Sequence, residues 1–143
     1  MGLLSMKRAL KLLIIMCFIN MGCQNPNEDC CNVLKEVKIG EAFSINEGET
    51  VEVQNSIIEL TFTDVLSDSL CPDDVQCITQ GTLSISIDIN GTSRNLSIGD
   101  SQNPSTNYKD YTIELQRLVY PTKQSEKDKI NSTYAIQMLI SRL

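Results

Sequence analysis

The segment TLSISIDINGTSRNLSIG, residues 82–99, decides the fold. Apolar and polar side chains alternate along residues 82–89, and a period of two is typical of a strand with one buried face. Asn90-Gly91 follows, and this pair favours a two-residue hairpin turn because both turn positions need a positive φ. Leu96 and Ile98 continue the inner face on the return strand. The segment therefore predicts a β-hairpin packed against a core. Four residues of its first strand are expected to point inward: Leu83, Ile85, Ile87 and Ile89.

The same alternation recurs along the rest of the body and predicts about seven or eight strands, with no convincing helix. The other expected strands are residues 37–39, 42–45, 51–53, 56–66, 111–115 with its continuation towards Pro121, and 134–140. Half-buried alternation favours antiparallel sheets, because parallel strands buried on both faces are apolar throughout. The predicted fold is all-β, an antiparallel two-sheet β-sandwich of immunoglobulin-like size. A small barrel is the alternative.

The composition excludes several classes of function. The chain has 143 residues, with 12 Lys and Arg, 18 Asp and Glu, 6 Cys, and no His or Trp. All the acidic residues lie at or after Glu28, so no nucleic-acid partner is expected, because such proteins neutralise phosphates with clustered Lys and Arg. Without His there is no Ser-His-Asp catalysis and no His-ligated metal. The sequence predicts no enzyme activity and no cofactor.

Residues 1–22 have the features of a bacterial lipoprotein signal peptide. Basic residues within the first eleven positions precede the apolar run LLIIMCFI at 12–19. That run is too short for a membrane span of about 20 residues but fits the core of a signal peptide. Asn20-Met21-Gly22-Cys23 resembles a lipobox, in which the cysteine is acylated and becomes the new N-terminus. A plain secretory signal and an uncleaved anchor are the alternatives, and translation could also start at Met6.

The predicted mature protein has two parts. Residues 23–34 are polar and contain Pro, which is typical of a tether, and residues 35–143 form the β-sandwich domain. Gln24 stands where an Asp would resemble an inner-membrane retention signal, so the expected location is the cell envelope, at the outer membrane. Removal of the leader leaves 9 basic and 18 acidic residues, a net charge of −9.

Four cysteines remain after Cys17 leaves with the leader and Cys23 takes the lipid. Cys71 and Cys77 bracket a short loop, and disulfides persist in exported proteins, so we expect a Cys71–Cys77 bridge. A metal site that adds Asp73 and Asp74 as ligands is the alternative, but the spacing is not that of a zinc ribbon and no second cysteine pair completes it. The state of the adjacent Cys30-Cys31 pair stays open.

The stretch FTDVLSDSLCPDDVQCITQG, residues 62–81, resembles a segment of small uncharacterised bacterial exported proteins and lipoproteins. Their shared feature is a D-S-x-C-P-x4-C loop between two strands, and the flanking segments extend the resemblance to about residues 37–140. Leu70 replaces a typical Arg and Thr79 replaces a typical Trp. The resemblance implies an exported β-sandwich with a disulfide-pinned loop, and it implies no activity.

Two functions follow from this organisation. The first is a non-catalytic, membrane-anchored lipoprotein module that binds a protein or glycan partner through loops at one end of the sandwich, at residues 67–80 and 99–108. The residues predicted to form the partner-binding loop are Asp68, Pro72, Asp73 and Asp74. The second is an inhibitor of an exported protease that presents the disulfide-pinned loop 71–77, because a rigid loop loses less conformational freedom on binding.

Overall fold

The computed structural model describes residues 34–129 and 133–143, which belong to a compact unit spanning Leu34–Leu143. The predicted signal peptide, Cys23, the Cys30-Cys31 pair and residues 23–33 of the tether lie outside the described residues. Within the described part the elements are β1 (Lys35–Val37), β2 (Phe43–Asn46), β3 (Thr50–Val53), β4 (Glu59–Asp68), β5 (Thr82–Ile89), β6 (Thr92–Gly99), β7 (Ser105–Tyr108), β8 (Tyr111–Tyr120), α2 (Gln124–Lys127) and β9 (Ala135–Arg142).

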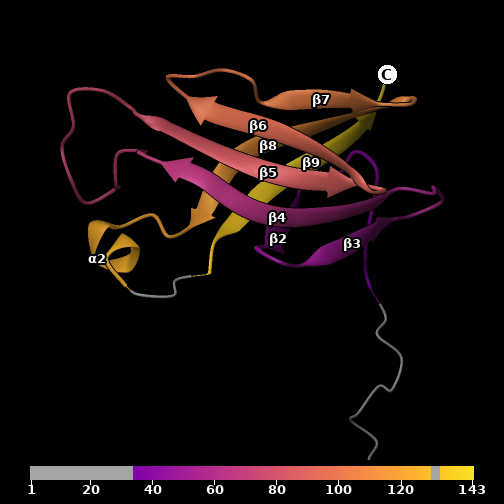
Figure 1. Ribbon diagram of the computed structural model, residues 1–143, viewed down its shortest axis with the longest axis horizontal. Helices are drawn as coiled ribbons and strands as arrows, with labels where there is room; N and C mark the ends of the chain where they lie inside the picture. The colour runs from indigo at the N-terminus through magenta and orange to yellow at the C-terminus, as the bar shows by residue number, and fades with distance from the viewer. Residues whose placement is uncertain (1–33, 130–132) are drawn as a thin grey trace, which may run out of the picture. The chain divides into compact units, whose positions relative to one another are not determined.

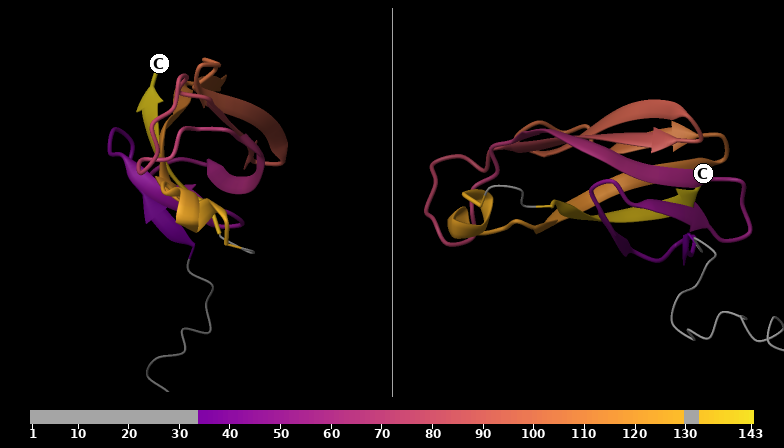
Figure 2. Two further views of the ribbon diagram at one scale, coloured as in Figure 1. Left: turned by 90° about the vertical axis from the view of Figure 1, so that its left-hand side faces the viewer. Right: turned by 60° about the horizontal axis from the view of Figure 1, so that its bottom comes forward.

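The strands form two separate sheets, which confirms the predicted β-sandwich (Figure 1). One sheet has the order β1-β3-β4-β5-β6 and the other has the order β2-β9-β8-β7. Figure 2 shows the two layers packed face to face. Neither sheet closes on itself within the described residues, so the alternative of a small barrel is wrong. All the strand pairs in these sheets are antiparallel except β1 with β3.

The central hairpin has the predicted register and turn. Ile89 pairs with Thr92, and the turn residues Asn90 and Gly91 have φ angles of 50° and 79°. The four predicted inward residues of β5 are completely buried. They join a core made mainly of Ile, Leu and Val from both sheets, which excludes water from the apolar faces of the strands. The strict alternation of residues 82–89 is therefore explained by burial of one face.

Two elements differ from the expectation for their segments. β7 occupies part of the 99–108 segment that the sequence predicts as a loop, and α2 is a single helical turn that the sequence does not predict. Both are short, and neither contains a buried residue, so neither leaves an apolar periodicity in the sequence. The N-terminus of α2 is held from outside, because Gln124 N–H donates to Asp74 Oδ1 over 2.9 Å.

Both sheets contain paired β-bulges in one long strand. The register of β4 shifts between Phe62 and Asp64 and again between Val65 and Ser67, and β8 shifts twice between Leu115 and Tyr120. Each extra residue turns the following side chains to the opposite face of the sheet. The second shift in β4 leaves Leu66 exposed and places Asp68 opposite the buried Leu83. Because the two shifts cancel, Asp68 lies on the core-facing side of β4 together with Leu60 and Phe62.

Candidate functional site

An open groove of about 890 Å³ lies between β6 and β8, and we call it the β6–β8 groove. Its walls are residues 97–99 of β6, residues 114–119 of β8, and parts of the disulfide loop and of the segment around α2. The volume lies within the range of about 300–1,000 Å³ that is usual for ligand pockets. The wall contains both apolar side chains, such as Ile98 and Leu118, and charged ones, such as Arg117.

The groove exists because β7 is much shorter than its neighbour β8. β7 pairs only with residues 111–114 of β8, and the next contact is a hydrogen bond of 2.7 Å from Leu115 N–H to Pro104 C=O. Pro104 has no N–H and cannot return the second bond of that pair. The ladder therefore stops, and the later part of β8 has no neighbouring strand on this side among the described residues.

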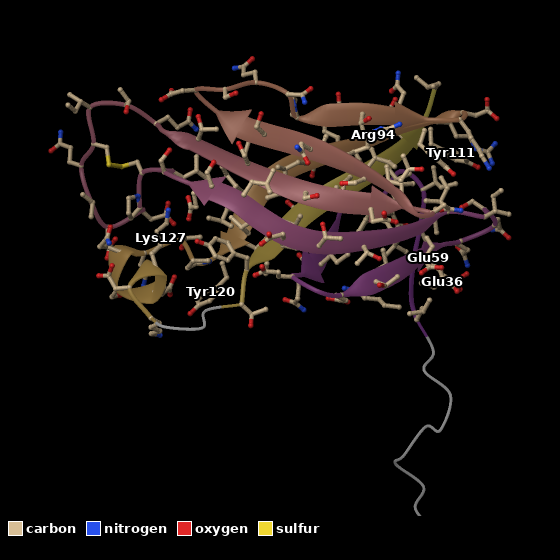
Figure 3. The ribbon with its side chains drawn as sticks, viewed as in Figure 1. Glu36, Glu59, Arg94, Tyr111, Tyr120 and Lys127 are labelled. Carbon is tan, nitrogen blue, oxygen red and sulfur yellow. A yellow bond between two sulfur atoms is a disulfide. The ribbon has the colours of Figure 1, made fainter. Side chains whose placement is uncertain are left out.

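A disulfide closes the loop that forms one wall of the groove. Cys71 and Cys77 are bonded, with a Cα–Cα distance of 5.9 Å, as the sequence predicts (the yellow bond in Figure 3). The loop also rests on the chain around α2, because Asp73 N–H donates to Thr122 C=O over 2.8 Å. Together with the Asp74 contact to the helix, these bonds fix the loop at several points. The loop is a rigid wall of the groove.

The four residues predicted for partner binding lie in different environments. Asp73 and Asp74 are exposed, and Pro72 is half-buried. The Asp68 side chain is only 5% exposed and faces the interior at the end of β4. Beyond these residues the loop presents Ile78, which is fully exposed. The accessible surface of the loop is therefore formed by residues 73–80 and does not include the Asp68 carboxylate.

Asp68 belongs to a buried polar cluster with Lys127 and Tyr134. Lys127 Nζ lies 2.8 Å from each carboxylate oxygen of Asp68 and donates to Leu70 C=O over 2.9 Å. The Tyr134 hydroxyl donates to Asp68 Oδ2 over 3.2 Å. Lys127 is the last residue of α2 and is labelled in Figure 3. Its side chain is 14% exposed and lines the groove. The cluster joins α2, the start of the disulfide loop and the entry to β9.

Sequence reasoning missed Lys127, Tyr134 and Leu118 as residues of this region. The first two join Asp68 across 59 and 66 residues of chain, so no local pattern connects them. The available signal was a pair of adjacent apolar residues, Val65-Leu66, which breaks the alternation of β4 where the register shifts. Leu118-Val119 marks a shift in β8 in the same way.

Tyr134 gives this cluster a pH signature. Burial, followed by the Asp68 carboxylate that repels a phenolate and accepts the hydroxyl bond, raises the pKa of Tyr134 from 10.0 to about 12. The folded state thus holds the Tyr134 proton more tightly than the unfolded state does. Protonated Tyr134 therefore contributes fully to the free energy of unfolding below pH 10, and this contribution is lost as the pH rises towards 12. We expect ultraviolet absorbance titration to show one tyrosine that ionises near pH 12. Tyr134→Phe should remove that step, whereas Tyr108→Phe should leave it; an unchanged curve for Tyr134→Phe would contradict the assignment.

A row of acidic side chains crosses the outer face of the other sheet. Glu36 pairs with Glu52, and Glu52 pairs with Glu59, so three exposed carboxylates stand side by side on β1, β3 and β4. Figure 3 labels the two outer members, Glu36 and Glu59. Like charges opposite one another destabilise a sheet.

The described residues contain no group of His, Cys, Asp and Glu that could hold a metal ion.

Removal of the middle charge should therefore stabilise the domain. We expect Glu52→Gln to raise the free energy of unfolding by about 0.5 kcal/mol, because it relieves repulsion from both neighbouring strands. Urea denaturation measures the gain, which should shrink at high salt as the charges are screened. The control is Glu41→Gln, which removes an exposed partner of Lys38 and should give no gain. Equal gains in both variants, or a gain independent of salt, would refute the repulsion.

Comparison with known proteins assigns no role to these surfaces. No protein-family model matches the chain, and no curated protein or solved structure matches it either. The resemblance carried by residues 62–81 is not tested by these comparisons and stays a prediction. No helix among the described residues is long and apolar enough to cross a membrane.

Proposed function

We propose that this protein is a non-catalytic lipoprotein module, anchored at the cell envelope through lipid on Cys23, which binds a protein partner in the β6–β8 groove. The observation that carries the proposal is the groove itself, whose walls include a loop fixed by the Cys71–Cys77 disulfide. Rigid walls favour binding because little conformational freedom is lost when the partner docks. The absence of His in the chain supports a binding role over acid–base catalysis.

The location of the groove supports a partner that lies away from the anchor. The described chain enters the domain at Leu34, at the opposite end of the sandwich from α2 and the disulfide loop (Figure 1). A lipid attached upstream of this entry point leaves the groove end of the domain accessible to other proteins. The proposed outer-membrane location follows from the residue after the lipobox, Gln24.

The chemistry of the groove favours a protein partner over a glycan. Sugar-binding sites commonly stack an aromatic ring on the apolar face of a sugar. None of the described residues that line the groove is aromatic. Its walls instead offer aliphatic side chains and scattered charges, with a disulfide on one side.

Site-specific cross-linking in native cells tests the proposal. A photoreactive residue at Gln116, which is exposed in the groove, should give one discrete adduct with another protein. The same residue at Ser93, which is exposed on β6 but does not line the groove, should give none. Adducts of equal intensity at both positions, or hydrolytic activity in the purified protein, would overturn the proposed function.

Lipid attachment has a separate test. Metabolic labelling with palmitate should mark the wild-type protein and not a Cys23→Ser variant, which should also leave the membrane fraction. A Cys17→Ser variant is the control, because Cys17 lies in the predicted leader and should not affect labelling. Labelling of both cysteine variants would refute the lipobox assignment.

The second candidate, inhibition of an exported protease, is favoured by one observation. Ile78 follows the disulfide directly, is fully exposed, and lies on a loop fixed to the rest of the domain. A panel of serine and cysteine proteases should be inhibited by the wild type and not by the Cys71→Ser, Cys77→Ser double variant. Ile78→Glu should lose inhibition with the disulfide intact. Identical behaviour of all three proteins would exclude this candidate.

A further inference from the structure

The unpaired edge of β8 determines which form of a polypeptide can enter the groove. Antiparallel strands bond through every second residue, so each residue directs its backbone polar groups to one neighbour or the other. Glu47 N–H donates to Tyr134 C=O over 2.8 Å, so the backbone groups of Tyr134 point towards β2. Every second residue of β9 after Tyr134 therefore also bonds to β2. Ile136 belongs to this set and also pairs with Ile45 of β2. Its backbone groups therefore point away from β8.

Leu118 lies directly opposite Ile136 in the β8–β9 ladder. Because Ile136 directs its bonds to β2, the N–H and C=O of Leu118 point away from β9 and towards the groove. Among the described residues, no backbone hydrogen bond joins residues 116–120 to any segment other than β9. Leu118 thus presents a donor and an acceptor in the spacing that an antiparallel strand would complete.

We propose that the β6–β8 groove binds an extended, net-basic segment of a partner protein, which adds to the β8 edge as a new strand and bonds to Leu118. This inference rests on the proposed function and specifies its binding mode. Strand addition obtains affinity from backbone bonds and specificity from alternate side chains. Ile98, Leu70 and Leu118 line the groove and would receive apolar side chains at every second position of the segment.

The charge of the domain favours a basic segment. Residues 34–143 contain 9 basic and 16 acidic residues, a net charge of −7. In the groove wall the acidic Asp73 and Glu114 outnumber the basic Arg117. Lys127 also lines the groove, but its charge is compensated by Asp68. An acidic surface attracts a cationic segment and raises its association rate, and it repels an acidic one.

The protein's own tether is a poor occupant for geometric reasons. Residues 24–33 span at most about 35 Å when fully extended. β4 alone has 10 residues and covers about 33 Å of the sandwich, and Leu34 enters at the end opposite the groove. A tether folded back into the groove would use its whole length and would draw Cys23 away from the membrane. A segment from another protein meets no such restriction.

Peptide selection on the full chain in detergent provides the test, with a displayed library of random ten-residue peptides as the probe. We expect selected peptides to be basic and apolar at alternate positions. In synthetic copies of the best binder, N-methylation of the one residue opposite Leu118 should weaken binding at least tenfold, and N-methylation of either neighbouring residue should weaken it less than threefold. Gln102→Trp, which fills the groove, should abolish binding, whereas Ser93→Trp outside it should not.

Each contrary outcome has a defined meaning. Failure to select any peptide, or equal N-methylation losses at neighbouring residues, would overturn strand addition. The Gln116 cross-link tests independently whether the groove is a binding site. If the cross-link forms but strand addition is refuted, the proposed function stands and only the proposed binding mode is wrong. A concentration-dependent dimer in light scattering that the peptide dissociates would assign the groove to a second copy of this chain and would also overturn the proposal.

Discussion

The Asp68→Asn variant should lose about 3 kcal/mol of unfolding free energy, because it leaves the Lys127 charge without its partner in a largely buried site. The carboxylate is 5% exposed and binds Lys127 through both oxygens. Asparagine has nearly the same shape, so the loss reports the missing charge and not a cavity. Urea denaturation monitored by circular dichroism measures it. A loss below about 1 kcal/mol would mean that water reaches Lys127 and replaces Asp68.

A double-variant cycle separates the pair from its surroundings. Lys127→Met should also destabilise the domain, because it leaves the Asp68 carboxylate buried without its cation. Asp68→Leu is the second single variant of the cycle. The Asp68→Leu, Lys127→Met double variant replaces both charges by apolar groups and should recover most of the stability that the single variants lose. A double variant as unstable as the sum of the single ones would show that the two side chains act independently.

The Gly81→Ala variant should destabilise the domain by about 3 kcal/mol and displace the base of the disulfide loop. Gly81 has a φ of +74°, which costs an L residue about 1–2 kcal/mol. A Cβ would also lie 1.9 Å from the Ser69 carbonyl oxygen, and backbone cannot move aside as a flexible side chain can. This collision adds an overpacking cost of about 1–3 kcal/mol. Thermal and urea denaturation measure the total.

Gly91→Ala is the matched control for the collision. Gly91 has a φ of +79°, and a Cβ there would meet no atom within 4 Å. It should therefore lose only the conformational term, about 1 kcal/mol. The Gly81→Ala variant should also shift the amide resonances of residues 69–82, because Ser69 and Thr82 exchange bonds beside it. Equal losses at both glycines would refute the close approach of Gly81 to Ser69.

The sandwich could be predicted from sequence because its information is local. Ile85 and Ile87 alternate with serines on one strand, and the two residues Asn90-Gly91 are enough to indicate the turn. The Cys71–Cys77 disulfide was equally accessible, since it closes over a separation of six residues. Patterns of this kind report burial of one face and the closure of short loops, and both are set by neighbouring residues.

The groove and its polar cluster could not be predicted because they depend on register. Asp68 follows two bulges whose shifts cancel, so it lies on the core-facing side with Leu60 and Phe62, but no local pattern shows which cation it meets there. Its partner Lys127 lies on a one-turn helix whose first N–H is held by Asp74, 50 residues away. The free edge at Leu118 exists because β7 begins only at Ser105 and pairs with β8 no further than Glu114. Such features are set by the ends of neighbouring strands, which no local pattern records.

The position of the β8 edge between β6 and the disulfide loop has a consequence for contacts between copies of the domain. Open strand edges invite pairing between molecules and so promote aggregation. Here β6 and the disulfide loop flank the unpaired part of β8, so the edge of another folded sheet would have to pass between them to reach it. A single extended chain is thin enough to enter. We therefore expect copies of the domain at high concentration to keep this edge open without polymerising through it.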